Sequence, residues 1–365
     1  MRTFVCVCGN RLFFDNTQCL ACHRQVGWCP RCAGIRALER EGDGRWRCTA
    51  SDCGALLVPC HNNAVEGVCN AMVEAEAVIS GKRPFCNACR FNHTVPDTSI
   101  AGNREKWAQI EAAKRRVLYT LDQLGLPYGT ANEGFDPALR FEFKADLVRS
   151  KERWSQLGPI EPVYTGHASG RITINLDEAD DAERERRRVH MNEAHRTLIG
   201  HFRHEIAHYF WDLLVRGRCE AAFCDHFGDH TDPPYREALK QYYAAGPPAD
   251  WQRGYVSAYA TMHPWEDFAE TFALFMDMVA VLETAGHWEM ESGIRPLDDL
   301  DATLRTYQRL GIRLNEINRE MGLLDLVPEI FVPPVIDKLR FVHALIRYGA
   351  GIDDAPAAPS EEVRA

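Results

Sequence analysis

The sequence predicts an α+β protein in two parts: a cysteine-rich N-terminal segment of small modules, followed by a larger, mostly helical domain with a small sheet. Twelve of the fourteen cysteines lie before residue 90, mostly as close pairs, whereas later stretches show helical apolar periodicity. At 365 residues, with 45% hydrophobic and 26% charged residues, the chain can bury a substantial core. Both observations favour two domains.

We expect the cysteine-rich domain to cover residues 1–95, the helical domain to cover 96–350, and 351–365 to be a disordered tail rich in Pro, Ala and Glu. Residues 171–178 alternate apolar and polar side chains, which predicts a half-buried strand. The first helix of the second domain is predicted by apolar residues at helical spacing: Trp107, Ile110, Ala113, Val117, Leu121 and Leu124.

Two further helices are expected at about 193–215 and 265–285, and the charged run 177–188 is expected to be a solvated face. The formal net charge is -10. Residues 1–95 carry 11 Lys/Arg and 8 Asp/Glu, so we expect no basic surface for nucleic acid. No apolar run suggests a membrane span, and the start has no signal-peptide pattern, so a cytoplasmic protein is expected.

The cysteine pairs fall serially into three sets of four, and four thiolates are the ligand set of a closed, tetrahedral, structural zinc site. The spacing resembles zinc-ribbon or rubredoxin-like modules, with about three structural Zn2+ in all. Iron in the first set, an interleaved pairing, and substitution by His23, His61 or His93 remain open. The predicted sets are Cys6, Cys8, Cys19 and Cys22; Cys29, Cys32, Cys48 and Cys53; and Cys60, Cys69, Cys86 and Cys89.

The stretch GHFRHEIAHYFWD contains His-Glu-x-x-His. On a helix, His204 and His208 share one face, so both rings can bind one metal ion. Glu205, beside them, would then take a proton from a metal-activated water. The motif is short, and it needs a third ligand.

The segment SAYATMHPWEDFAETFALF supplies a candidate ligand. Glu266 and Glu270 lie one turn apart in otherwise apolar sequence, where uncompensated carboxylates are costly to bury. Two histidines and Glu266 would leave the fourth position of one catalytic zinc open to water. Glu270 would accept the free N–H of one histidine and fix its tautomer.

The spacing of HEIAH, Tyr259, Glu266 and Glu270 resembles that of the gluzincins of the anthrax lethal factor type. With the cysteine-rich start and RITINL, these motifs also resemble a bacterial family of zinc-binding metallopeptidases with an N-terminal zinc-ribbon domain. The resemblance implies a zincin-like fold for residues 96–350 and hydrolysis of peptide bonds. It also implies that Tyr259 donates to the oxyanion and that the strand at 171–176 can pair with an extended peptide. A plain core strand is the alternative.

Several other residues have metal-like or site-like spacing. His201 and Asp212 lie one turn from the motif histidines, and Tyr255 rivals Tyr259 on spacing alone. The group Cys219, Cys224, His226 and His230 has metal-like content without knuckle spacing on both sides, so free thiols in a loop are expected there.

The expected partner is a peptide or protein substrate, with a protein partner possible through the zinc ribbons. Two alternatives remain: a non-enzymatic scaffold that binds through its ribbons, and a nucleic-acid-linked protease of the SprT-like type. SprT-like proteases have the reverse domain order, with the zinc ribbon after the catalytic domain, and they use a third histidine as a metal ligand where this chain has Glu266. A scaffold would not need the combination of site residues, namely His204, Glu205, His208, Tyr259 and Glu266.

Overall fold

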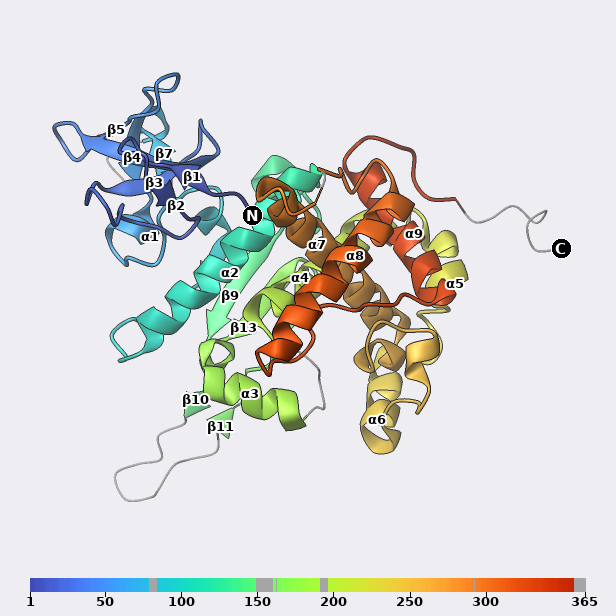
Figure 1. The fold of residues 1–365 in the computed structure, drawn as a ribbon. Helices are drawn as coiled ribbons and strands as arrows, with labels where there is room; N and C mark the ends of the chain where they lie inside the picture. Colours follow the sequence, from blue (N-terminus) through green and yellow to red (C-terminus); the bar gives the residue numbers. More distant parts are fainter. Residues whose placement is uncertain (79–83, 149–159, 162, 191–195, 292, 358–365) are drawn as a thin grey trace, which may run out of the picture. The chain divides into compact units, whose positions relative to one another are not determined.

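The computed structural model describes residues 1–78, 84–148, 160–161, 163–190, 196–291 and 293–357 (Figure 1). The chain forms two compact units. Unit 1 comprises residues 1–116, 140–165 and 173–181; unit 2 comprises 117–139, 166–172 and 182–365. The domain boundary expected near residue 96 falls inside unit 1, and the division into domains at that residue stays a prediction. Most of the tail expected at 351–365 lies outside the described residues.

The cysteine-rich segment is built from short antiparallel strands. Strands β1 (Phe4–Val5) and β2 (Arg11–Leu12) form one hairpin. A second, five-stranded sheet has the sequential order β3-β4-β5-β6-β7. Its strands are β3 (Val26–Cys29), β4 (Gly34–Arg40), β5 (Trp46–Cys48), β6 (Leu56–Pro59) and β7 (Met72–Glu74). Short strands joined by tight turns bring consecutive cysteine pairs together.

Short elements complete the described part of this segment: helix α1 (His61–Ala64), the 3-10 turns Ala75–Ala77 and Cys89–Phe91, and strand β8 (Asn92–Thr94). Helix α2 (Asn103–Leu124) follows. The six apolar residues that predicted α2 are all buried, which confirms the periodicity. The boundary between the units runs through α2.

A four-stranded sheet has the order β12-β13-β9-β8, with β8 and β9 parallel. Its later strands are β9 (Arg140–Lys144), β12 (Gly166–Ala168) and β13 (Arg171–Asn175). Strand β13 confirms the alternation read in the sequence, since Ile172 and Ile174 are buried. It lies between β12 and β9, so the expectation that β13 pairs with a peptide is wrong. Among the described strands, the two edges of this sheet are β12 and β8.

The remaining elements include a 3-10 turn at Ala131–Glu133, the two-stranded pair β10 (Leu147–Val148) and β11 (Ile160–Glu161), and a 3-10 turn at Leu176–Ala179. The charged run 177–188 begins in this turn, where Glu178 is buried, contrary to the expected solvated face. It continues into helix α3 (Asp181–His190), whose described side chains are exposed or half-buried, as expected. None of the described helices is long and apolar enough to cross a membrane.

Unit 2 is mostly helical. Its long helices after α3 are α4 (Leu198–Phe210), α7 (Pro264–His287), α8 (Leu300–Glu320) and α9 (Pro333–Gly349). Shorter elements are the π-helical turn Trp211–Val215, α5 (Glu220–Phe227), α6 (Tyr235–Ala245) and the 3-10 turns Trp251–Arg253 and Tyr259–Met262. The fold class expected from the sequence is therefore confirmed.

Capping explains where the two central helices begin. Thr197 Oγ1 accepts a hydrogen bond from the Gly200 N–H at 3.0 Å, which places the start of α4 at Leu198. The expected start near residue 193 lies outside the described residues. His263 caps α7 by accepting from the Trp265 N–H at 3.2 Å, and Pro264 occupies the first turn, where no backbone donor is needed.

An aromatic core joins α4 to α7. The rings of Phe210 and Phe272 stack with centroids 5.5 Å apart, and Phe268 adds a third ring at 5.6 Å from Phe272. All three side chains are fully buried. Because this contact lies on the apolar faces of both helices, it also determines which polar side chains of α4 and α7 meet.

We expect Phe272→Ala to lower the free energy of unfolding of unit 2 by about 3–5 kcal/mol, the usual result of removing a buried aromatic ring. Ile317→Ala, at a side chain that is 57% exposed, is the matched control and should change it by less than about 0.5 kcal/mol. Urea unfolding followed by far-UV circular dichroism measures both. Equal losses would contradict this assignment of the core.

Candidate metal centres and active site

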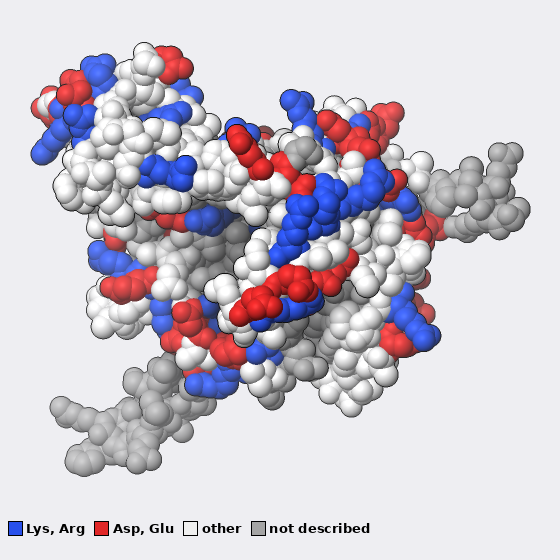
Figure 2. Space-filling model, in the orientation of Figure 1, with Lys and Arg blue, Asp and Glu red and all other residues white. Residues whose placement is uncertain are grey.

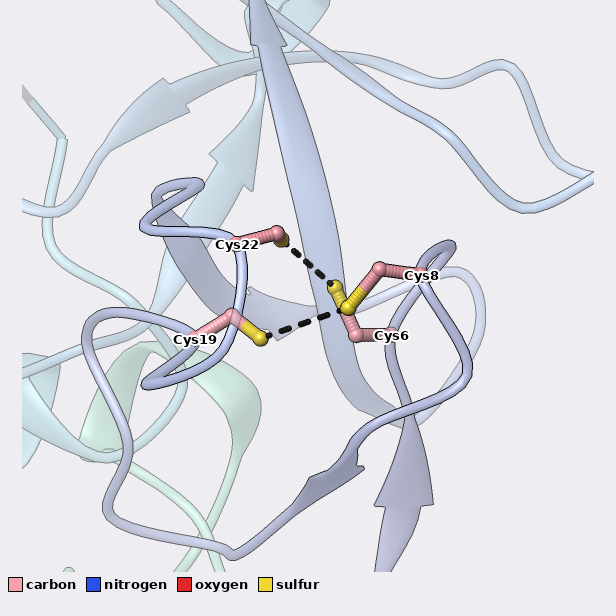
Figure 3. A group of neighbouring side chains, drawn as sticks. All are labelled: Cys6, Cys8, Cys19 and Cys22. Atoms are coloured by element: carbon pink, nitrogen blue, oxygen red, sulfur yellow. Dashed lines mark hydrogen bonds between the residues drawn. The ribbon is translucent and has the colours of Figure 1, made fainter.

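The structure brings the twelve N-terminal cysteines together in the three serial sets, with the ligand atoms of each set within 4.8 Å of one another. Figure 3 shows the first set, in which two loops each supply two cysteines. Cys6 and Cys8 belong to the turn between β1 and β2, and Cys19 and Cys22 to the loop before β3. None of the candidate histidines belongs to a set within the described part of the chain.

The sulfur separations fit zinc. Cys6 and Cys22, and Cys8 and Cys19, have sulfurs 3.7 Å apart. In the second set the Sγ atoms of Cys29 and Cys53 are 3.8 Å apart and those of Cys32 and Cys48 are 3.7 Å apart. In the third set those of Cys69 and Cys86 are 3.8 Å apart. A tetrahedron with Zn–S bonds of the usual length has sulfurs about 3.8 Å apart. The donor geometry therefore matches three closed, four-thiolate sites.

The first and third sets differ in burial. Cys8 is exposed, whereas Cys60, Cys69, Cys86 and Cys89 are all buried. Backbone N–H groups also point at sulfurs in the third set, with 3.3 Å from Cys86 N to Cys60 Sγ and 3.3 Å from Ala71 N to Cys69 Sγ. In the first set, the backbone N–H of Cys22 lowers the pKa of Cys19 to about 6. Such donors stabilise thiolates.

Helix α2 contributes to the surroundings of the third set, inside unit 1. Glu111 Oε1 lies 3.4 Å from Cys89 Sγ, and Lys114 Nζ lies 2.5 Å from the same Glu111 oxygen. Lys114 also donates to the Ala88 carbonyl at 2.9 Å. Glu111 and Lys114 are both fully buried. The third cysteine set is therefore built on residues from both sides of position 96.

The His-Glu-x-x-His motif lies in α4, within unit 2. The Nε2 atoms of His204 and His208 are 3.2 Å apart, as their one-turn spacing predicts. Both rings remain partly exposed, with 15% and 16% of the side chains accessible. A metal ion held here would therefore be reachable from solvent.

Glu266, from α7, completes the set. Its Oε2 lies 2.9 Å from His204 Nε2 and 3.5 Å from His208 Nε2. Ligands of a tetrahedral zinc with N and O bonds of usual length lie about 3.3 Å apart, so the three atoms surround a point that fits Zn2+. Burial opposes ionisation of Glu266, but His208 and His204 outweigh it and hold its pKa well below the usual range.

Glu270 lies one turn after Glu266 and approaches the other ring nitrogen of His204. Its Oε1 is 2.7 Å from His204 Nδ1. An ionised carboxylate accepts the Nδ1–H and leaves the Nε2 lone pair directed at the metal position. The sequence left open which histidine Glu270 contacts, and the structure places it on His204.

Glu205 and Tyr259 border the same centre. Glu205 is buried, which raises its pKa, and the two motif histidines oppose that shift. The ring of Tyr259 lies 6.1 Å from that of His204. Tyr255 instead has Lys338 Nζ 4.0 Å from its ring centroid, and Lys338 pairs with Asp267 at 2.6 Å. Tyr255 is thus engaged with Lys338.

The other residues considered from the sequence do not join a metal-capable group among the described residues. His201 lies on α4 beside the motif. Asp212 is buried in the π-helical turn rather than exposed, and it pairs with Arg216 at 2.5 Å. The four residues in and around α5 do not form a metal-binding group: Cys219, Cys224, His226 and His230.

Two site neighbours were not anticipated. His167, on β12, stacks on His208 with ring centroids 6.1 Å apart, and burial lowers its pKa to about 3. Tyr235, the first residue of α6, donates from its hydroxyl to Glu266 Oε1 at 2.8 Å. Tyr235 precedes Glu266 by 31 residues and follows a proline-rich loop, so no local spacing connects the two.

Comparison with known proteins shows the family of the chain. A family model described as "Putative zinc-binding metallo-peptidase" matches residues 103–345, and a zinc-ribbon domain model matches residues 3–100. The chain belongs to that zinc-binding metallopeptidase family. Uncharacterized proteins of Mycobacterium tuberculosis H37Rv and Mycobacterium bovis are 34% identical over 357 residues, covering 95% of this chain and 95% of each relative. No solved structure matches the chain significantly.

We expect the purified chain to hold about four zinc ions, one for each of the four groups of ligands. Cys86→Ser should lower the content by about one zinc, because it removes a ligand from the buried third set. Cys224→Ser, outside all four groups, should leave the content unchanged. Elemental analysis of the purified, folded variants measures this. A wild-type content near one zinc would contradict the three thiolate sites.

Proposed function

We propose that this protein is a zinc-dependent peptidase of the gluzincin type. One observation carries the proposal: the Nε2 atoms of His204 and His208 and Oε2 of Glu266 converge within zinc-binding distance of one point. Glu205 lies beside them on α4. Two histidines and a glutamate leave a coordination position open for chemistry, as in thermolysin-like sites.

Zinc bound there would supply Lewis acidity and make water a stronger nucleophile. The protein's own groups would move the protons. Glu205 takes the proton of the attacking water and passes it to the leaving amine, a role that its buried position favours. Tyr259 donates a hydrogen bond to the oxyanion of the tetrahedral intermediate. Glu270 keeps His204 in the tautomer that a metal ligand needs.

A peptide substrate would lie along β12. This strand is one of the two edge strands of its sheet in the described structure, and it packs against α4 within unit 2. An extended peptide can add to such an edge through main-chain hydrogen bonds, which recognise the backbone rather than one side chain. The edge therefore favours a peptide or protein as the substrate.

The three thiolate sites leave no open coordination position, so we assign the zinc ribbons to recognition or placement rather than to chemistry. Figure 2 shows basic and acidic side chains side by side on the face drawn. Arg309 and Arg313 both pair with Glu291. We also propose a cytoplasmic location, because twelve cysteines grouped as metal ligands rather than as disulfides suit a reducing compartment.

Glu205→Gln should keep the catalytic zinc and lower turnover of a peptide by about 10² or more, because it removes only the proton acceptor. Glu266→Ala should instead lose that zinc, because it removes a ligand. A peptide library cleaved by the wild type, with zinc content measured alongside, tests both variants. Full zinc in Glu266→Ala would contradict the ligand set, and unchanged turnover in Glu205→Gln would contradict the role of Glu205.

Tyr259→Phe should keep zinc and lower kcat by roughly 10² to 10³, with little change in KM, because the hydroxyl acts where the oxyanion develops. Tyr255→Phe is the matched control, since the Tyr255 ring packs against Lys338. Steady-state kinetics on the same peptide distinguishes the two tyrosines. A kcat loss in Tyr255→Phe alone would overturn the assignment.

A further inference from the structure

Tyr235 contacts the metal ligand Glu266 from the side opposite the histidines. Its hydroxyl donates to Oε1 at 2.8 Å, whereas Oε2 of the same carboxylate is the oxygen nearest to His204 and His208. The two oxygens of Glu266 therefore have separate partners. Glu266 is 2% exposed, so water does not compete readily for the Oε1 position.

The ring of Tyr235 is held by the two residues that flank Pro264. Its centroid lies 5.2 Å from that of His263 and 5.9 Å from that of Trp265, both within three residues of Glu266. The start of α6 is thus packed on the start of α7. Side chains fixed in this way can hold a ligand in one orientation.

We propose that Tyr235 is a positioning residue that makes Glu266 a one-oxygen metal ligand. This inference rests on the zinc site of the proposed function. A carboxylate whose Oε1 is engaged by a hydroxyl binds through Oε2 alone, so it occupies one coordination position. The position that two-oxygen binding would fill then stays open for water or substrate.

The test is the zinc affinity of the full-length chain, measured by competition with a chromophoric chelator. The relevant zinc is the equivalent that His204→Ala lacks, so the structural sites do not enter the comparison. Tyr235→Phe should weaken binding of that zinc by about 10- to 100-fold, the usual effect of losing a partner behind a metal ligand. Phe keeps the ring contacts at this half-buried position, and thermal unfolding verifies the fold.

Tyr243→Phe, on the same helix at a side chain 63% exposed, is the matched control and should bind zinc like the wild type. Tyr259→Phe should stay within about twofold, because Tyr259 does not touch the ligand oxygen. Wild-type affinity in Tyr235→Phe would overturn the inference and leave the zinc site standing. A wild type that lacks this zinc equivalent would overturn both. Neither result depends on finding a substrate.

Discussion

The contact between α4 and α7 is the interaction on which the site depends. Stacked, fully buried aromatic side chains such as Phe210 and Phe272 hold the two helices at one register. That register places Glu266, which an apolar interior would otherwise disfavour, against His204 and His208. The cost of burying the carboxylate is offset only where the histidines and a cation meet it. Packing and metal chemistry therefore require the same arrangement.

Much of the site could be predicted because its information is local in the sequence. His204 and His208 share a face through one helical turn, and so do Glu266 and Glu270, whatever the tertiary structure. The cysteines behave in the same way. Each set takes its cysteines from two consecutive pairs along the chain, so serial grouping follows from the short connections. The alternation over residues 171–178 likewise predicted a strand.

The parts that could not be predicted depend on contacts between distant residues. Tyr235 reaches Glu266 across a proline-rich loop, and His167 reaches His208 from a separate strand. Whether β13 is an edge or an interior strand depends on its neighbours in the sheet rather than on its own alternation. Asp212 was expected to be exposed, but it is buried in a π-helical turn and pairs with the exposed Arg216. The periodicity of a sequence does not indicate contacts between residues far apart in the chain.

The burial of Glu111 and Lys114 beside Cys89 has a consequence for protein engineering. A zinc ribbon is often treated as a cassette that can be exchanged between proteins. In a chimaera joined at residue 96, a foreign ribbon would face Glu111 and Lys114, whose side chains contact the native ribbon. The buried Glu111–Lys114 pair would then lack its native partners on Ala88, Cys89 and Asn92, which is costly. A graft therefore has to carry the first half of α2 with it, because Glu111 and Lys114 lie there.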